Sequence, residues 1–409
     1  AAIRFSNLNF WKNGGIGRVL TDFRIRGSYA EVGNDDIGNF LFNDTFGPTM
    51  YGSSSALIYS NVGNKDLRWE RQKILDVGFD LSLFDRVNLS FAYWQKNNSD
   101  IILSVPTPPS LGIPGNSISQ NYGDVENNGI EFEIGGVVVD KGDFSWSSSL
   151  NFTTQNSRVD RLVSDIISNS VLLIREGEPL YSIYVHRYAG VNMANGNPMY
   201  YKKDGSIVQC NPIDGKYYVY DPANPDDMSE ENNLLDEDKE IIGTTIPKWF
   251  GGFNNTFRYK NWDLNIFLRF SGGNYIFNYQ RINMLSMGFY NNSTEILGRW
   301  QSPENPGDGQ TPKLYYNKTS QVSYTNSSRW VEKGDFLKIQ DISLGYSFPY
   351  RICQKMLIQK LRLYIQAQNL ATFSTYSGLD PESYTSALGI DRSGEPQQMQ
   401  FLFGLSIGF

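Results

Sequence analysis

The only histidine in the sequence, His186, limits the chemistry that this protein could perform. Zinc sites built from several histidines are excluded, and any Ser/His/Asp triad would depend on this one imidazole. We therefore expect His186 to lie on a surface or to line a lumen, without a catalytic role. The sequence predicts no enzymatic activity and assigns no catalytic residue.

Two glutamates at i, i+2 spacing, Glu131 and Glu133, resemble the carboxylate pair of a glycoside hydrolase. They belong to "GIEFEI" (129–134), where apolar and acidic residues alternate. Residues two apart in a strand share one face of the sheet, so both carboxylates would lie on a polar face. Arg269 holds the same kind of position in another alternating stretch. We expect these three residues to line a polar wall, as candidates for substrate binding rather than catalysis.

The composition is typical of an acidic, β-rich protein. Aromatic residues make up 14% of the 409 residues, and the formal net charge is −7. This charge argues against a nucleic-acid partner held by phosphate attraction. No stretch approaches the roughly 20 apolar residues of a membrane helix. A membrane β-barrel would escape such a scan, because its lipid-facing residues alternate with polar ones.

Alternation of apolar and polar residues recurs along the chain and predicts about ten strands. In 74–84, for example, Val77 and Phe79 share one face, and Asp76 and Asp80 share the other. The predicted strands cover 22–30, 74–84, 87–94, 129–139, 144–154, 249–259, 262–270, 335–348, 361–370 and 398–409. In the stretch 335–348 the apolar phase slips near residues 340–341, which predicts a β-bulge.

Connections between the predicted strands alternate between short and long. The short ones lie near 85, 141, 260 and 349–360, and the long ones cover 33–67, 103–122, 157–246, 274–334 and 372–396. This is the arrangement of an outer-membrane barrel with short periplasmic turns and long extracellular loops. A soluble β-sandwich or propeller, the alternative, has no reason to sort its loops by length. The same topology puts Cys210 and Cys353 on opposite sides of the membrane, so we expect them not to pair.

The last predicted strand is apolar on one face up to its final residue. Leu405, Ile407 and Phe409 alternate with Ser406 and Gly408. In a closed barrel this face lies in lipid and the strand's edge is paired, so we interpret the three apolar residues as an assembly signal. The opening "AAIRFSNLNFWK" shows neither an initiating Met nor a signal peptide. We expect the chain to be the C-terminal piece of a longer precursor.

Six stretches, in fixed order, together with the terminal Phe409, resemble SusC/RagA-type TonB-dependent outer-membrane transporters. They are "NKDLRWERQKILDVGFDLSLFDRVNLSFAYWQKNNSDIIL", "NYGDVENNGIEFEI", "GEPLYSIYVHRYAGVN", "IPKWFGGFNNTFRYKNWDLNIFL", "FLKIQDISLGYSFP" and "LRLYIQAQNLATFSTYSGLDPE". The resemblance implies an all-β fold, a transmembrane antiparallel β-barrel of about 22 strands around an N-terminal plug. Residues 1–409 would form its last ten or so strands, and residues 1–5 the tail of the strand before them. The plug and the N-terminal domain would lie outside this sequence.

The resemblance also implies a function and partners. Members of the family import oligosaccharides or peptides across a Bacteroidota-type outer membrane. They act with a SusD-like lipoprotein on the extracellular side and with TonB, which would contact the missing plug region. The barrel itself would be embedded in outer-membrane lipid. Two other roles are open: a structural or accessory subunit of a larger outer-membrane complex, and a passive porin or adhesin.

An acidic run, "DDMSEENNLLDEDKEIIG" (226–243), corresponds to a stretch that often looks like a calcium loop in SusC-like proteins. Here Asn233 stands about where the turn glycine is needed, and the regular acidic spacing is absent. The resemblance therefore leaves Asp236 and Asp238 as candidate calcium ligands. A solvated acidic loop without metal is the simpler expectation, and no other cofactor is predicted.

Overall fold

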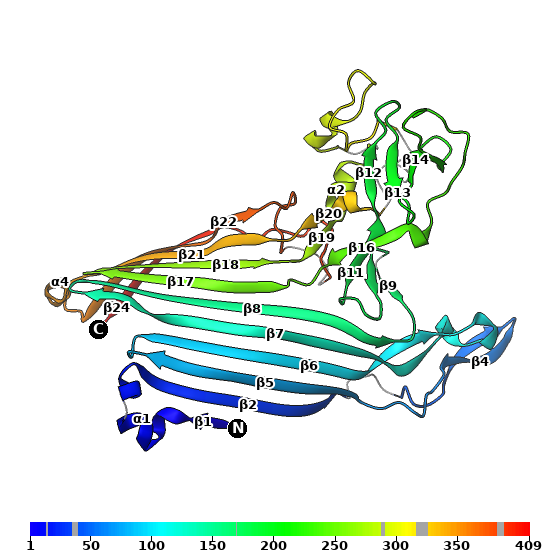
Figure 1. Cartoon of the computed structure of the whole chain (residues 1–409). Coiled ribbons are helices and arrows are strands. Elements are labelled where there is room, and N and C mark those ends of the chain that lie inside the picture. The colour runs from blue at the N-terminus through cyan, green and yellow to red at the C-terminus, as the bar shows by residue number, and fades with distance from the viewer. Residues whose placement is uncertain (14, 35–39, 169, 288–290, 316–325, 383–387) are drawn as a thin grey trace.

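The computed structural model describes residues 1–13, 15–34, 40–168, 170–287, 291–315, 326–382 and 388–409. Its dominant feature is one antiparallel sheet of eleven strands, which follow one another in the sheet in chain order (Figure 1). These strands are β1 (Ala2–Arg4), β2 (Leu20–Asn34), β5 (Glu70–Leu83), β6 (Val87–Pro106), β7 (Ser117–Lys141), β8 (Phe144–Leu162), β17 (Trp249–Tyr259), β18 (Trp262–Gly272), β21 (Phe336–Ser347), β22 (Lys360–Ser374) and β24 (Gln400–Gly408).

All ten predicted strands belong to this sheet, and the all-β, antiparallel fold class is confirmed. The one strand of this sheet that was not predicted is the short β1, whose Ile3 pairs with Ile25 of β2. One predicted connection is wrong, because β6 and β7 continue to pair through Ser104 and Ser119. Both strands extend through mostly polar residues beyond the expected boundary, so the connection shrinks from 103–122 to ten residues, 107–116. Strand β8 likewise runs to Leu162, past the expected start of the connection 157–246.

The β-bulge predicted from the slip in apolar phase is present at Gln340. Ile339 pairs with Leu268 and Asp341 with Phe267, so Gln340 is left without a partner in this ladder. One extra residue restores the alternation, and the apolar residues on both sides of the bulge share one face of the sheet.

The pairing register aligns like residues into rows across the strands. An apolar row crosses seven strands through Leu81, Leu89, Ile134, Leu150, Phe253, Leu268 and Ile339. A polar row on the opposite face contains Asp80, Ser90, Glu133, Asn151, Arg269 and Lys338, with Gly252 of β17 between Asn151 and Arg269. A continuous apolar face of this size is unstable against water and needs an apolar surrounding.

The end of the sheet that carries the short connections is named here the short-turn end. Its turns lie at 84–86, 142–143 and 260–261, and α4 (Tyr350–Lys355) lies within the connection from β21 to β22. Trp262 and Tyr346 pack with ring centroids 4.7 Å apart, and Trp262 is 49% exposed. Exposed aromatic rings at strand ends are typical of the membrane–water interface.

The opposite, long-connection end carries folded structure of its own (Figure 1). The elements that we name the outer module are β9 (Ile166–Ser168), β10 (Leu172–Ile174), β11 (Ser182–His186), β12 (Tyr188–Val191), β13 (Pro198–Tyr201), β14 (Ile207–Asn211), β15 (Lys216–Val219), β16 (Lys239–Thr244), β19 (Tyr275–Asn278), α2 (Tyr279–Met284), β20 (Val331–Lys333) and β23 (Ile390–Asp391). Its core includes Leu172, Ile183, Phe277, Ile282 and Trp330, each at most 1% exposed.

A hairpin and a short α-helix also lie outside the outer module. The hairpin of β3 (Thr45–Tyr51) and β4 (Ser54–Asn61) projects from the long-connection end (Figure 1). α1 (Asn9–Asn13) lies between β1 and β2. Within the described residues, no helix has the length and apolar character needed to cross a membrane.

Candidate substrate-facing site on the polar face of the sheet

Two cations stand directly opposite each other on neighbouring strands. Arg269 of β18 pairs in the ladder with Lys338 of β21, and both side chains lie on the polar face. Like charges in this position destabilise a sheet unless carboxylates lie between them. Acidic residues from elsewhere in the chain must therefore neutralise Arg269 and Lys338.

The segment 375–382, which follows β22, supplies those carboxylates. Lys338 Nζ lies 2.9 Å from Asp380 Oδ1 and 2.6 Å from Glu382 Oε2, and Glu382 also forms an ion pair with Arg269. Lys338 is only 2% exposed and Asp380 only 5%. Because each charge has an oppositely charged partner, the network can persist with little water around it.

The same segment has two more anchors nearer to β22. The Ser377 backbone N–H and hydroxyl each donate to a Glu332 carboxylate oxygen at 2.7 Å. The Tyr376 hydroxyl donates to Asp391 Oδ2 at 2.6 Å, and burial raises the pKa of this phenol. Contacts from four of its residues, Tyr376, Ser377, Asp380 and Glu382, thus hold the segment 375–382 to the outer module and to the polar face of the sheet.

A cavity of about 400 Å³ opens beside the Arg269–Glu382 ion pair. Its walls combine amides, aromatic rings and charges, among them Asn151, Gln155, Phe250, Phe267, Arg269 and Glu382. Asn151 Oδ1 accepts from the Gly252 N–H at 2.8 Å, and Phe250 is 40% exposed. Exposed rings can stack on a flat part of a ligand while amides and ions bind its polar groups. This cavity is our candidate substrate-facing site.

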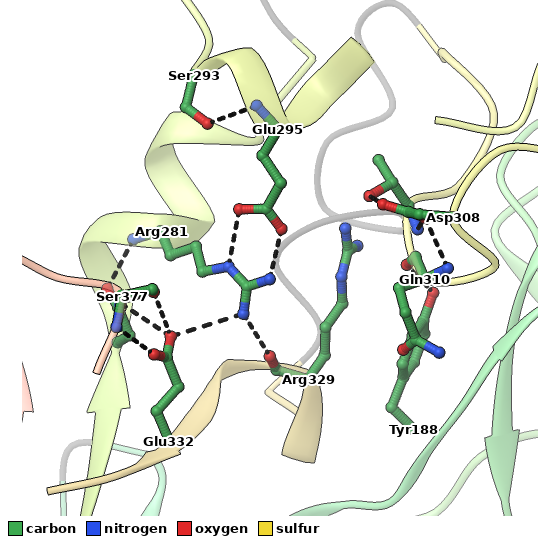
Figure 2. Close-up of polar contacts among 11 residues, drawn as sticks. Tyr188, Arg281, Ser293, Glu295, Asp308, Gln310, Arg329, Glu332 and Ser377 are labelled. Carbon is green, nitrogen blue, oxygen red and sulfur yellow. Dashed lines mark hydrogen bonds and ion pairs between the residues drawn. The ribbon is translucent and has the colours of Figure 1, made fainter. Parts of the chain in front are cut away.

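A second polar cluster, shown in Figure 2, lies in the outer module around Arg281 of α2. The Arg281 guanidinium binds both carboxylate oxygens of Glu295, with Nε 3.1 Å from Oε2, and lies 3.5 Å from Glu332 Oε1. Its Nη1 also donates to the Arg329 carbonyl at 3.2 Å. Because Glu332 also accepts from Ser377, this cluster links the outer module to the segment 375–382.

Arg269, Glu131 and Glu133 lie on the polar face, but the structure does not bring them together. Glu133 and Arg269 share a row and are separated by three strand spacings, roughly 14 Å. Both glutamates are exposed, and only Arg269 lines the cavity. Sequence reasoning missed Lys338, Asp380 and Glu382 as members of the site. The position of Lys338 opposite Arg269 could have indicated that acidic residues must lie nearby.

His186 lies in β11 and is 8% exposed, so the expected surface or lumen position is wrong. Burial, together with the charge of Lys239, lowers its pKa to about 4, and the imidazole is neutral near pH 7. A Gly-x-Ser-x-Gly string at 404–408 does not make a nucleophile elbow, because Ser406 lies inside β24 and pairs with Arg362.

The candidate calcium ligands contact lysines. Asp236 lies 2.7 Å from Lys239 Nζ, and Asp238 lies 3.0 Å from Lys202 Nζ. Asp238 also accepts from the backbone N–H of Leu235 at 2.8 Å. Among the residues with a described position, no group of three or more His, Cys, Asp or Glu side chains could hold a metal ion.

Cys210 in β14 and Cys353 in α4 lie at opposite ends of the molecule (Figure 1). Both thiols are free and buried. The strand that carries the expected assembly signal is the last of the sheet, and Leu405 and Phe409 are 58% and 85% exposed. The signal itself stays a prediction.

Comparison with known proteins identifies the family. Residues 3–370 match the family described as "TonB dependent receptor-like, beta-barrel". TonB-dependent receptors P3 and P39 of Formosa agariphila are 28% and 30% identical and cover 98% and 99% of this chain, which spans 40% and 42% of their lengths. TonB-dependent receptor SusC of Bacteroides thetaiotaomicron is 25% identical over 96% of this chain and 38% of its own length.

The solved structure of the RagAB peptide transporter has the same fold. It superposes on 100% of this chain and on 43% of its own chain, with a TM-score of 0.80 and 22% sequence identity. The SusC/RagA-type resemblance noted from the sequence is therefore confirmed, and the chain spans about two fifths of the proteins that it matches. The chain belongs to the TonB-dependent receptor family and forms part of its outer-membrane β-barrel.

Proposed function

We propose that this chain is the barrel wall of a TonB-dependent importer of oligosaccharides or peptides. The observation that carries the proposal is the two-faced sheet, whose apolar rows suit lipid and whose polar row is overlaid by the segment 375–382. The polar face would line the transport lumen, and the cavity beside Arg269 would contact substrate on its way to the plug. Family membership and the likeness to SusC and RagAB support this role.

Two partners belong to the proposal. A SusD-like lipoprotein would cover the long-connection end, where the outer module and the β3–β4 hairpin project. TonB would act through a plug region encoded outside these residues. Energy would then come from TonB, and selection of substrate from the outer module and the polar face.

The test uses the full-length protein in its native host. Uptake of fluorescently labelled peptide and oligosaccharide mixtures is measured in the wild type, in a strain lacking this gene, and in a strain with TonB inactivated. The proposal expects at least one mixture whose uptake is lost in both mutant strains. Uptake that depends on the gene but not on TonB would indicate a passive channel. Loss of envelope integrity without any transport defect would instead favour a structural subunit of a larger complex.

The contribution of the cavity is tested separately with Arg269→Met. The variant should raise the substrate concentration needed for half-maximal uptake while the protein reaches the outer membrane at normal levels. Arg24→Met is the matched control, because Arg24 is exposed on the same face of the sheet, six strand spacings away from Arg269. Equal uptake curves for Arg269→Met and wild type would remove the cavity from the transport path.

A further inference from the structure

Arg329, in the short 3-10 helix Ser328–Trp330 of the long-connection end, has a covered guanidinium group with no anion bound to it among the described residues. Its Nε, Nη1 and Nη2 atoms are all buried, and none has a hydrogen-bond acceptor among the described residues. Figure 2 shows the guanidinium beside the Arg281 cluster, with no contact drawn from its nitrogens. A guanidinium stays protonated at every physiological pH, so it cannot escape burial by losing its charge.

Aromatic rings account for part of its environment. The Arg329 Cζ lies 4.4 Å from the ring centroid of Trp330 and 5.5 Å from that of Tyr188. These cation–π contacts favour a positive charge, but they provide no oxygen for the five N–H donors. Because an aromatic ring covers the face of the guanidinium, the N–H groups in its plane remain available to bind a ligand.

Acidic residues in the neighbourhood are committed to other donors. Glu295 and Glu332 bind Arg281. Asp308 accepts from the backbone N–H groups of Gln310 at 2.8 Å and of the next residue, Thr311, at 2.6 Å. The sequence segments 288–290 and 316–325, which adjoin the cluster along the chain, contain no Asp or Glu. The described part of the chain therefore supplies Arg329 with no carboxylate, although buried charges in proteins are ordinarily paired.

We propose that Arg329 binds a carboxylate group of the imported substrate, an inference that rests on the function proposed above. The planar fork of a guanidinium matches the two oxygens of a carboxylate, which can accept two parallel hydrogen bonds. Arg329 as a whole residue is only partly buried, although its three guanidinium nitrogens are covered. Entry of the carboxylate displaces the covering atoms, and the oligomer that carries it extends outward from the outer module.

The experiment measures carboxylate preference with the full-length transporter purified in detergent, together with any lipoprotein that co-purifies. Two pairs of fluorescent probes are titrated: a tetra-alanine peptide with a free C-terminal carboxylate against its C-terminal amide, and trigalacturonate against its methyl ester. The two pairs distinguish a peptide from a sugar as the source of the carboxylate. Each is titrated with wild type, Arg329→Met, Arg329→Lys and Arg187→Met. Arg187 is the matched control, because it stacks on Tyr201 at 4.0 Å in the same module but is 45% exposed.

In the wild type, the acidic member of at least one pair should bind tenfold or more tightly than its neutral counterpart. Arg329→Met should reduce this ratio to within twofold of unity and leave the Kd of the neutral probe unchanged. Arg329→Lys should keep part of the preference, and Arg187→Met all of it. The ratio is measured within one protein sample, so a partly misfolded variant still reports it.

Two results would overturn the proposal: no carboxylate preference in either pair for the wild type, or a preference that survives in Arg329→Met. A lower Tm for Arg329→Met with an unchanged ratio would show that Arg329 only supports the fold. These failures are separable from failure of the importer function. TonB-dependent uptake without carboxylate preference would reject only carboxylate binding by Arg329. Uptake that does not require TonB would reject the proposed importer function.

Discussion

Replacing Lys338 by Met should release the segment 375–382 from the polar face. The ammonium is 2% exposed and lies within 3.0 Å of both Asp380 and Glu382, so its loss leaves two carboxylates facing each other. Breaking a buried ion pair by removing one partner costs about 3–5 kcal/mol. Arg269 still neutralises Glu382 in the variant, which limits the cost to about the lower value.

This cost should appear as local opening rather than as unfolding of the barrel. Strand β21 keeps its ladder to β18 and β22, whereas the segment 375–382 can move its acids into water by detaching. A penalty of about 3 kcal/mol corresponds to a hundredfold or greater rise in the open population. Hydrogen exchange of the full-length protein should therefore accelerate by that factor in 375–382 and stay unchanged in β17 and β18.

A double-mutant cycle isolates the ion pair from the loss of the lysine stem. Asp380→Asn alone should also open the segment, and Lys338→Met/Asp380→Asn should be less open than the sum of the two single variants. Arg24→Met, an exposed cation on the same face, should change exchange by less than twofold. Wild-type protection of 375–382 in Lys338→Met, or strict additivity in the cycle, would refute the view that this pair holds the segment.

Three further outcomes follow from the same structure. Ile266→Arg on the apolar face should cost about 2–4 kcal/mol in a urea-unfolding assay. Asn265→Lys, which loses hydrogen bonds of 2.9 and 3.0 Å on the polar face, should cost only about 1–2 kcal/mol, and equal penalties would reject the assignment of faces. The depressed pKa of His186, about 4, means that the unfolded state takes up the proton first as pH falls. Stability of the outer module against proteolysis should therefore drop between pH 6.5 and 4 by about 3 kcal/mol, and His186→Gln should remove that drop. Burial raises the pKa of Cys210 to about 12, so a thiol reagent should label it only after denaturation, and rapid labelling of native protein would contradict its position.

The large sheet could be predicted from sequence because its information is local. Alternation with period two is visible within each strand, and the slip at Gln340 is visible within a few residues. The short turns near 85, 141 and 260 force the two strands that each of them joins to pair. The extents of several strands were underestimated, because polar residues continue a ladder where apolar alternation no longer marks it. Examples are Ser104 of β6, Ser119 of β7 and the last eight residues of β8, which runs to Leu162 instead of 154.

The outer module could not be predicted in the same way, because its strands are short and its partners are distant. β19 pairs with β20 and, in parallel, with β23, which lies more than a hundred residues further along the chain. Strands of two to six residues carry too few alternations to stand out from a loop. His186 shows the consequence: its burial depends on this distant packing, and nothing in its immediate sequence indicates it.

The two faces of the sheet therefore depend on different parts of the chain. An apolar residue such as Ile266 needs only the surrounding lipid, so each strand can specify that face by itself. A charged residue on the polar face depends on what lies above it, and Lys338 beside Arg269 would be unfavourable without Asp380 and Glu382. Asp380 and Glu382 belong to the connection between β22 and β24, at the long-connection end of the sheet. If the polar face lines a transport lumen, as proposed, changes in the long connections can alter what it binds while the lipid-facing pattern stays the same.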